Sequence, residues 1–488
     1  MYIVMVTSEC APVAKVGGLA DVVQGLSREL EMRGNAVEII LPFYDCMRFD
    51  QIWGLQKTYS DLWVPFYDQH IHCDVYFGFV DGLKCFFIKP HSQQNFFNRG
   101  DFYGDHDDPE RFAFFSRAAL QFMLKTNKHP DVIHCHDWQA GLVPVLLYDM
   151  YKHLGMSHSR VCYTLHNLKH QGMCGPHVLR QVGLDPARYF NHHQLQDDHN
   201  HSAFNLMKGG IVFSNFVTTV SPRYAWEIKH SEVGYGLQNT LHVHAAKFGG
   251  VLNGVDYNVW NPEIDQYIAC QYSIGSIDDK YKNKEVLRHR LLLRHNMKPI
   301  VAVVSRLDHQ KGVNLIRHAI TYSLANDCQF VLLGSSPDSG INHEFWQIKQ
   351  SLNDNPDCHF EIAYDEELAH LIYAGSDMLL IPSAFEPCGL TQMIAMKYGT
   401  VPIVRSTGGL ACTVFDADYA HLPYHERNGY VFNDLNNEGL ESAMKRAVGM
   451  WHSYPQHFRE LMENGMRYDY SWNHPGSDYV KIYEYIRE

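Results

Sequence analysis

Two cations and their setting suggest chemistry on a phosphorylated substrate. Arg306 and Lys311 lie in residues 305–312, directly after a buried strand and before a helix. Arginine offers a fixed fork to phosphate oxygens and lysine a mobile point charge, so together they could stabilise a departing diphosphate. The alternative is an ordinary solvated pair on the surface. The spacing favours a diphosphate site at the end of a strand.

A carboxylate follows another buried strand. Residues 385–392 read Phe-Glu-Pro-Cys-Gly-Leu-Thr-Gln, and a helix is expected to begin near Thr391. Glu386 would repel phosphate but suits sugar hydroxyls, while the amides at the helix start would face the diphosphate. Alternatively, Glu386 is only a structural carboxylate at the start of a helix. The segment predicts a sugar contact next to a phosphate contact.

A lysine and a glycine pair follow the first strand of the chain. Lys15 precedes Gly17 and Gly18, which enter a helix, and such a turn exposes backbone N–H groups to an anion. The pattern is neither G-x-G-x-x-G nor a P-loop. An ordinary tight turn therefore explains it equally well.

Two strand ends in the first half of the chain mix polar and aromatic side chains, the mixture that binds sugars. They contribute His134, His136, Asp137, Trp138, His166 and Asn167. Strand alternation puts His134 and His136 on one face, which would also suit a metal, but no further ligands at zinc spacing accompany them. We expect a sugar-binding surface and no metal.

The elements that must position these groups form two similar units. Each passes from a buried strand through a loop into a helix and back to another buried strand, the pattern of a βαβ unit. Ligands of doubly wound sheets bind beyond the carboxyl ends of such strands, where the loops above lie. We expect strands at residues 1–6, 37–41, 132–134, 161–164, 216–220, 300–304, 330–333 and 378–382.

The length of 488 residues allows two buried cores, and we expect two Rossmann-like doubly wound α/β domains. The glycines of residues 249–254 mark the expected join, and a cleft at that hinge is the default site. Tyr479, Ile482, Tyr483 and Ile486 have helical spacing, which predicts an amphipathic terminal helix.

Composition narrows the classes of partner. The net charge of -13 opposes nucleic-acid binding, which depends on clustered lysine and arginine. No apolar run is long enough for a membrane span or a signal peptide. The 12 cysteines include no C-x-x-C pair, so neither a zinc ribbon nor a disulfide framework is indicated. We expect a cytoplasmic protein with no nucleic-acid or membrane partner.

The motifs described so far belong to a larger ordered set, which consists of residues 15–21, His136-Asp137-Trp138, His166-Asn167, Lys208-Gly209, residues 252–256 with 260–262, residues 305–312, residues 385–392 and residues 407–410. Taken together, these motifs resemble bacterial glycogen synthase and plant starch synthase over nearly the whole chain. Residues 96–112 most resemble the starch synthase III/IV branch and its cyanobacterial relatives.

The resemblance implies a GT-B fold and transfer of glucose from ADP-glucose to an α-1,4-glucan, with retention of the α configuration and without a cofactor or metal. It implies an acceptor-side domain over residues 1–250 and a donor-binding domain over residues 251–468. Residues 469–488 would cross back to the first domain. Closure of the cleft would exclude water, which otherwise competes as acceptor.

The resemblance also assigns roles to individual residues. Tyr364 would stack on adenine, and the main-chain carbonyl of His166 would face the developing positive charge at the anomeric carbon. Catalytic roles fall to Glu386, Lys311, Arg306, His166 and Lys15. Donor contacts fall to Lys15, Gly18, Asn253, Ser305, Arg306, Lys311, Gly334, Tyr364, Glu386, Cys388, Gly389, Leu390 and Thr391. Acceptor contacts fall to Asp21, Tyr103, Asp137, Trp138, Asn167 and Gln171.

The sequence departs from related patterns at two positions, and two rival functions remain. Other GT-B enzymes often carry a second glutamate where this chain has Ile394, and many relatives carry alanine where it has Gly210, for which we expect a small effect.

One rival is a transferase using UDP-glucose and a small acceptor, such as sucrose synthase or sucrose-phosphate synthase. The other is a glucan-binding or initiation protein of low activity. Residues 15–18 and 386–390 argue against the first, and the intact diphosphate clamp argues against the second.

Overall fold

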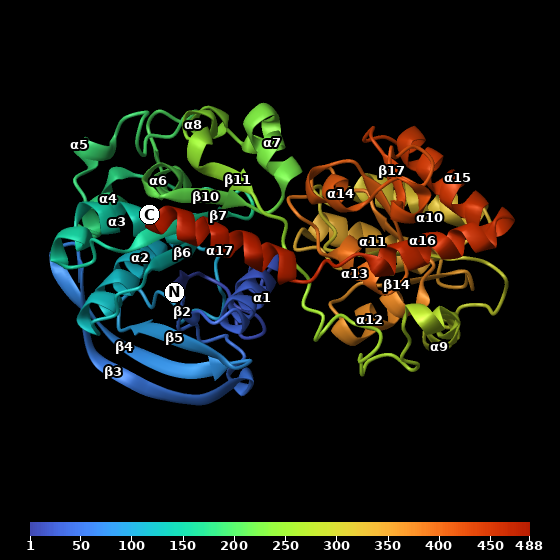
Figure 1. The fold of residues 1–488 in the computed structure, drawn as a ribbon, viewed down its shortest axis with the longest axis horizontal. Helices are drawn as coiled ribbons and strands as arrows, with labels where there is room; N and C mark the ends of the chain where they lie inside the picture. The colour runs from blue at the N-terminus through green and yellow to red at the C-terminus, as the bar shows by residue number, and fades with distance from the viewer. The chain divides into compact units, whose positions relative to one another are not determined.

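Two compact units divide the chain, which a computed structural model describes over residues 1–488 (Figure 1). Unit 1 comprises Met1–Gly254 and Trp472–Glu488, and unit 2 comprises Val255–Ser471. The divisions lie a few residues after the predicted boundaries at 250 and 468. None of the helices combines the length and apolar character needed to cross a bilayer.

Unit 1 is built on a nine-stranded sheet in the order β11-β10-β7-β6-β1-β2-β5-β4-β3. The pairings are parallel except those of β4, which is antiparallel to both β3 and β5. The strands are β1 (Tyr2–Val6), β2 (Ala36–Pro42), β3 (Ile52–Phe66), β4 (Gln69–Val80), β5 (Leu83–Pro90), β6 (Val132–His136), β7 (Arg160–Leu165), β10 (Phe216–Thr219) and β11 (Phe248–Gly250). A separate two-stranded pair joins β8 (Met173–Cys174) and β9 (Phe204–Asn205).

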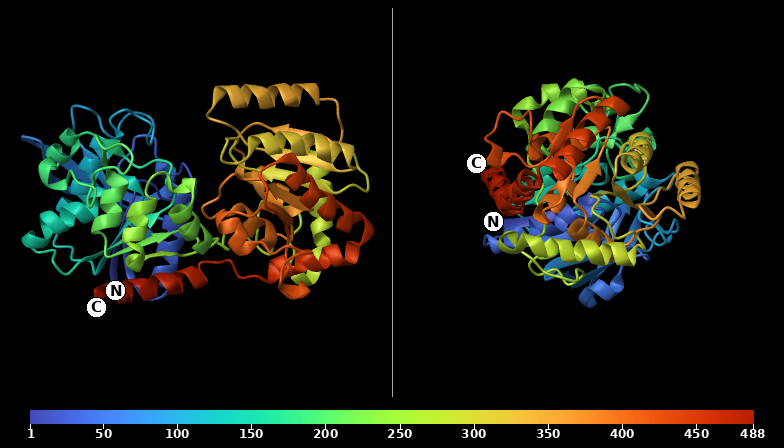
Figure 2. Two further views of the ribbon diagram at one scale, coloured as in Figure 1. Left: turned by 90° about the horizontal axis from the view of Figure 1, so that it is seen from above. Right: turned by 90° about the vertical axis from the view of Figure 1, so that its right-hand side faces the viewer.

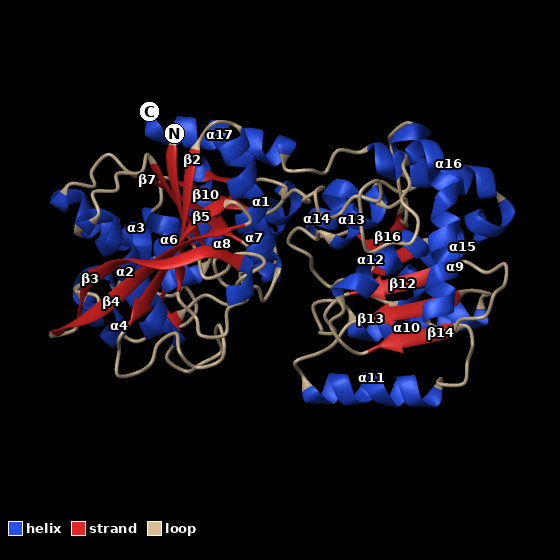
Figure 3. Ribbon diagram, turned by 90° about the horizontal axis from the view of Figure 1, so that it is seen from below, coloured by secondary structure: helices blue, strands red, loops and turns tan.

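Burial separates the parallel centre of this sheet from its antiparallel edge. Residues 3–6 of β1 are fully buried, as expected for a strand covered on both faces. The edge hairpin of β3 and β4 is long (Figure 3) and half exposed, with register shifts along its pairing. Trp53 on β3 is 76% exposed. The parallel strands therefore form the centre of the unit, and the hairpin extends it outward.

The helices of unit 1 pack on this sheet and on one another. They are α1 (Gly18–Met32), α2 (Asp108–Lys125), α3 (Leu142–Asp149), α4 (Pro176–Gln181), α5 (Pro186–Tyr189), α6 (Leu206–Phe213), α7 (Pro222–His230), α8 (Gln238–Val243) and α17 (Asn473–Arg487). On α1, Leu19, Val22, Val23, Leu26 and Leu30 are buried, which gives the helix one apolar face.

The terminal helix α17 returns to unit 1 and lies beside α1 (Figure 1). Trp472, just before it, packs so closely on α1 that a Cβ at Gly25 would lie 2.0 Å from the indole nitrogen. The two chain ends lie close together (Figure 2), because Asp131 accepts a bond from Tyr2 N at 2.7 Å and pairs with Arg487 at 3.1 Å. The terminal helix is thus part of the first unit.

Unit 2 is built on an entirely parallel six-stranded sheet in the order β14-β13-β12-β15-β16-β17. Its strands are β12 (Ile300–Val304), β13 (Gln329–Leu333), β14 (Cys358–Glu361), β15 (Met378–Ile381), β16 (Val401–Arg405) and β17 (Tyr430–Phe432). Its helices are α9 (Lys280–Arg290), α10 (Val313–Ala325), α11 (Ser339–Ser351), α12 (Glu366–Gly375), α13 (Thr391–Lys397), α14 (Gly408–Thr413), α15 (Asn437–Ser453) and α16 (Pro455–Arg467).

Strand order defines where each unit is expected to bind a ligand. In unit 1 the order reverses at β1, which pairs with β2 on one side and with β6 on the other. In unit 2 it reverses at β12, which pairs with β13 and with β15. Ligands of open α/β sheets bind beyond the strand ends at such switch points. The loops after β1, β6, β12 and β15 are therefore the candidate binding loops.

Candidate active site

A small hollow at the switch point of unit 2 collects the loops after β12 and β15. Ser305 and Lys311 come from the first loop, Ser383 from the second, and Thr391 begins α13. The Ser305 hydroxyl is buried and has no hydrogen-bond partner. A buried polar group of this kind is costly unless something satisfies it. The hollow thus has an unused donor and acceptor next to a lysine.

Lys311 and Glu386 form the centre of this arrangement. The lysine Nζ lies 2.6 Å from Glu386 Oε2, which also accepts a bond from the Ser383 hydroxyl at 2.9 Å. The main-chain N–H of Lys311 donates to Asp308, which fixes the turn that carries it. Next along the chain, Gly312 has φ +75 and a Cβ there would meet the Pro382 carbonyl oxygen at 2.2 Å. The two loops therefore touch through a glycine as well as through the ion pair.

Close backbone contacts hold the loop of Glu386. A Cβ at Gly408 would lie 1.8 Å from the Glu386 carbonyl oxygen, and one at Gly409 would lie 1.8 Å from that of Cys388. Gln392 donates from Nε2 to the carbonyls of Cys388 and Gly389. Helix α13 begins at Thr391, as predicted, so Glu386 precedes the helix by several residues and does not cap it.

Three other predicted donor residues of unit 2 are Arg306, Tyr364 and Gly334. Arg306 is exposed, and its nearest charged neighbour is Asp308 at 3.7 Å. Tyr364 is 76% exposed, and its hydroxyl donates to Glu366 at 3.4 Å. Gly334 lies against the loop after β12, because a Cβ there would meet the Ser305 carbonyl oxygen at 1.9 Å. The side chains of Arg306 and Tyr364 are thus exposed to solvent, whereas Gly334 allows two backbone segments to approach closely.

Sequence reasoning missed the residues that brace this site. Arg405, at the end of β16, donates from Nη1 to the Ala384 carbonyl at 2.6 Å and holds the loop before Glu386. Ser383 and Gln392 act on the same loop. Arg405 follows the run Val-Pro-Ile-Val of residues 401–404, which was not predicted as a strand and is the signal that could have placed it at a strand end.

The turn that carries Lys15 in unit 1 corrects one expectation. The N–H groups of Val16 and Gly17 donate to Glu9 Oε2 at 2.6 and 3.0 Å, so these amides are not open to a bound anion. Glu9 is 2% exposed and was not singled out in the sequence. Lys15 pairs with Asp21 at 2.8 Å. Gly18 is exposed at the start of α1, where first-turn N–H groups have no partner within the helix.

Asp137 and His166 lie at neighbouring strand ends. Asp137 has φ 55, an unusual value for a residue other than glycine, and its Oδ1 accepts the N–H of His166 at 2.7 Å. Burial raises the pKa of Asp137 to about 7. Trp138 is buried behind it and Gly172 makes room for its ring, while Asn167 accepts the Lys169 N–H at 3.0 Å. The carboxylate therefore fixes the main chain at His166.

Three buried histidines extend from this point into the unit. His166 Nε2 lies 3.0 Å from His136 Nδ1, and the rings of His136 and His134 are 4.2 Å apart. Both ring nitrogens of His134 are bonded, to Tyr483 and to Thr164. Burial lowers the pKa of His134 and of His166 to about 3. The histidines that sequence alternation placed on one face are engaged with each other and with hydroxyl groups.

The remaining predicted residues of unit 1 differ in how many hydrogen bonds their side chains already make within the chain. Gln171 donates from Nε2 to the carbonyls of Leu168 and Tyr235 and accepts from Asn205, so its amide is already used within the chain. The expected contact of Gln171 with an acceptor stays a prediction, for which the amide oxygen keeps one acceptor position. Asn253 is buried, and its Oδ1 has no partner.

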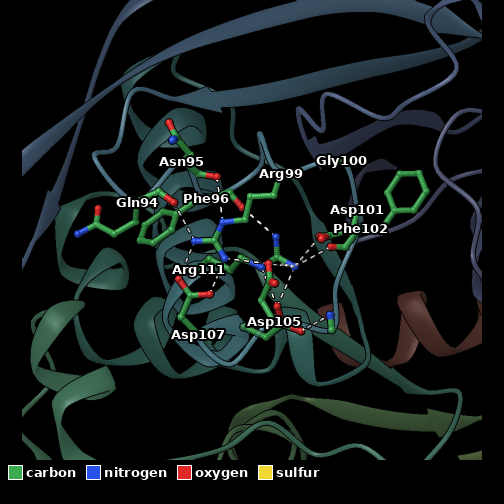
Figure 4. Close-up of polar contacts among 12 residues, drawn as sticks. Gln94, Asn95, Phe96, Arg99, Gly100, Asp101, Phe102, Asp105, Asp107 and Arg111 are labelled. Carbon is green, nitrogen blue, oxygen red and sulfur yellow. Dashed lines mark hydrogen bonds and ion pairs between the residues drawn. The ribbon is translucent and has the colours of Figure 1, made fainter.

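Tyr103 comes from a loop that two arginines hold (Figure 4). Its hydroxyl donates to Glu9 Oε1. The side chain of Arg111 is fully buried and donates to the carbonyl of Phe102, the residue before the tyrosine, at 3.0 Å. Tyr103 is therefore fixed both at its hydroxyl and at its main chain.

Comparison with known proteins follows the same division of the chain. Residues 2–243 match the family model "Starch synthase catalytic domain" and residues 288–461 match "Glycosyl transferases group 1". The chain is 68% identical over 488 residues to "Glycogen synthase 1" of Nitrosococcus oceani, with 100% of both chains covered. This chain belongs to the glycogen synthase family. It is also 65% identical to "Glycogen synthase 2" of Methylococcus capsulatus, covering 99% of each chain.

Solved structures place this glycogen synthase family member in the GT-B fold. The catalytic domain of starch synthase IV from Arabidopsis thaliana, bound to ADP and acarbose, matches with a TM-score of 0.97 and 43% identity, covering 100% of this chain and 99% of that one. Sucrose-phosphate synthase from Thermosynechococcus elongatus matches with a TM-score of 0.62 at 18% identity. The second likeness concerns the fold alone.

The two departures from the patterns of related enzymes have different structural settings. Ile394 is 6% exposed on α13, where its apolar side chain is buried. A Cβ at Gly210 would lie 2.3 Å from the Tyr163 ring. The sequence predicted a small effect of this glycine, but the contact means that an alanine would force the tyrosine to move. Gly210 is therefore coupled to the position of Tyr163.

Proposed function

We propose that the chain transfers glucose from ADP-glucose to the non-reducing end of an α-1,4-glucan and retains the α configuration. The observation that carries the proposal is the contact of Lys311 with Glu386 at the switch point of unit 2. It sets a cation suited to a diphosphate beside a carboxylate suited to sugar hydroxyls. The solved relative with ADP bound supports a donor built on ADP.

The proposed reaction proceeds on one face of the donor sugar. The bond from the anomeric carbon to the diphosphate breaks, a bond to the acceptor hydroxyl oxygen forms, and the proton of that hydroxyl passes to the departing diphosphate. Arg306 and Lys311 stabilise the growing negative charge on the diphosphate. Glu386 holds the glucose, and the carbonyl of His166 faces the positive charge at the anomeric carbon. The products are ADP and a glucan that is longer by one glucose.

Groups of unit 1 supply the acceptor side in this proposal. Asp137 fixes the main chain at His166, and its remaining oxygen is suited to accept a sugar hydroxyl. Tyr103 and Trp138 contribute a hydroxyl and an aromatic ring. Gln171 acts through its contacts with Leu168, Tyr235 and Asn205, which hold the segment behind these residues.

The decisive experiment compares two donors on purified protein. The protein is incubated with ADP-glucose or UDP-glucose, with and without maltooligosaccharides of graded length, and chain extension and nucleotide release are measured. We expect extension from ADP-glucose that depends on the acceptor. Preferential use of UDP-glucose would overturn the donor assignment. Binding of maltooligosaccharide without turnover would instead identify a glucan-binding protein.

A further inference from the structure

Glu9 connects two loops that the proposed function assigns to different substrates. It lies in the loop after β1 and is 2% exposed. One carboxylate oxygen accepts the N–H groups of Val16 and Gly17, in the turn of Lys15, and the other accepts the hydroxyl of Tyr103. A single side chain thus bonds to the donor-side turn and to an acceptor-side residue.

The main chain of Glu9 is itself held in place. Its N–H donates to the Thr7 hydroxyl at 3.2 Å, and the same hydroxyl donates to the Glu9 carbonyl at 3.0 Å. The neighbouring carbonyl of Ser8 accepts the hydroxyl of the buried Tyr44 at 3.0 Å. The carboxylate therefore projects from a fixed backbone and cannot follow one loop without straining its bonds to the other.

Two arginines hold the loop that carries Tyr103 (Figure 4). Arg111 donates to the carbonyls of Phe96 and Phe102 and pairs with Asp108. Arg99 bonds to both carboxylate oxygens of Asp107. Figure 4 shows the two guanidinium groups side by side within this loop. Tyr103 is thus a rigid point against which Glu9 can hold the turn of Lys15.

The charges near the turn explain why a carboxylate is suited to this task. Three donors satisfy Glu9, and two of them are amides that would otherwise point unpaired from the turn. These two amides are therefore not available to a bound anion. Burial raises the pKa of Glu9, so its hydrogen bonds to the amides and to Tyr103 are what support its charged form.

We propose that Glu9 is a positioning residue for glucosyl transfer, which fixes the turn of Lys15 and Gly18 relative to Tyr103 by bonding to both. The inference rests on the proposed function, because that function assigns the turn to the donor and Tyr103 to the acceptor. It predicts that loss of the carboxylate weakens the use of both substrates together.

The test compares three variants by kinetics. Glu9→Ala removes every bond and is expected to lower kcat/KM for both substrates by about 100-fold, the cost of a misplaced catalytic group. Glu9→Gln can still accept the amides through its oxygen and donate to Tyr103 through its nitrogen, so activity is expected to stay within about tenfold of wild type. Tyr103→Phe removes only the bond between Tyr103 and Glu9 and keeps the two amide bonds, so it is expected to raise KM for the maltooligosaccharide more than KM for ADP-glucose.

Three outcomes would overturn the proposal. Equal inactivity of Glu9→Gln and Glu9→Ala would indicate that the negative charge of Glu9 acts directly in the reaction and that its hydrogen bonds alone are not sufficient. Loss of activity in Glu9→Ala only in proportion to unfolded protein would indicate a purely structural role. The control for the second outcome is Met123→Ala, which removes a buried side chain of α2 away from these loops. Unchanged KM for either substrate in Glu9→Ala would exclude a link between the two sides.

Amide hydrogen exchange tests the link without relying on activity. In Glu9→Ala, we expect faster exchange both in residues 14–18 and in residues 99–105. Faster exchange in residues 14–18 alone would contradict the proposal. Absence of transfer by the wild-type protein would refute the proposed function, whereas the exchange result would still decide whether Glu9 joins the two loops.

Discussion

The ammonium nitrogen of Lys311 lies 2.6 Å from Glu386 Oε2, and this contact joins the loops after β12 and β15. The side chains are 18% and 8% exposed, so neither charge is well solvated. Each partner therefore stabilises the charge of the other in the protein without substrate. A diphosphate that approaches the lysine would compete with the carboxylate for it.

Removal of either partner tests the role of this pair. We expect Lys311→Ala and Glu386→Ala each to lower turnover by about 100-fold or more, because each removes a group that stabilises the reacting substrate. Each also leaves a poorly solvated charge unpaired and lowers stability, whereas the double variant regains part of that stability and stays inactive. Turnover per folded molecule and thermal unfolding are the measurements. Lys445→Ala, at an exposed site on α15, is the control. Near-normal turnover in either single variant would refute the assignment.

Substitution of Arg306 is expected to lower activity without lowering the stability of the fold. Its guanidinium is exposed and lies 3.7 Å from its nearest charged neighbour, so Arg306→Ala is expected to change unfolding by less than about 0.5 kcal/mol. Its effect on kcat is expected to be large, because the fork that stabilises the departing diphosphate is lost. Arg306→Lys restores a charge but not the fork, so only partial recovery is expected. Steady-state kinetics with ADP-glucose measure this, and full activity of Arg306→Ala would contradict it.

Substitution of Tyr364 tests the expected stacking of its ring on the adenine of the donor. Its ring is 76% exposed, so substitution costs little packing. We expect Tyr364→Ala to raise KM for ADP-glucose about tenfold through the loss of stacking, with kcat nearly unchanged. Tyr364→Phe keeps the ring and is the matched control. An equal effect of both variants would assign the contribution to the hydroxyl instead of the ring.

Much of the arrangement around these residues could be predicted from the sequence. The strand Ile300–Val304 and the helices that begin at Val313 and Thr391 lie where the pattern placed them, because continuous apolar runs and glycine-marked turns are local signals. The hairpin of β3 and β4 was not predicted. Its burial does not alternate regularly, and register shifts interrupt its pairing, so period-two patterning is weak.

The braces of the site were harder to predict than its charged groups. Glu9 bonds to the turn at Val16 and to the distant side chain of Tyr103, and Arg405 bonds to the Ala384 carbonyl. Only the folded chain reveals those partners. Gly210 was expected to matter little, because nothing local indicates that Tyr163 packs against it. Sequence thus indicated which residues could react, and the structure identified which residues hold them.

The buried histidines give a prediction for pH dependence. Burial lowers the pKa of His134 and His166 to about 3, against an ordinary value of about 6.5. The native protein therefore does not protonate them as the pH falls below about 6.5, whereas the unfolded chain does, so they make stability decrease toward acid. Nitrogen NMR of labelled histidine should show both rings neutral and unchanged from about pH 5 to 8. Titration of His166 within that range would contradict the structure.

A pair of glycines offers the sharpest test of how the Glu386 loop is supported. Gly409, on α14, lies so close to the loop that a Cβ would meet the Cys388 carbonyl oxygen at 1.8 Å, whereas a Cβ at Gly449 on α15 would meet nothing within 4 Å. Gly409→Ala must push the loop outward, so we expect a loss of about 1–3 kcal/mol of stability and about 100-fold of activity.

The control reverses the sign of the stability effect. Gly449→Ala adds a good helix former without a clash and is expected to stabilise by about 1 kcal/mol with normal activity. Denaturant unfolding and steady-state rates on both variants make the comparison. Because both changes add the same methyl group to a helix, a difference in activity between them can come only from contact with the loop. Normal activity of Gly409→Ala would mean that the loop tolerates displacement and that the position of Glu386 is less restricted than its contacts indicate.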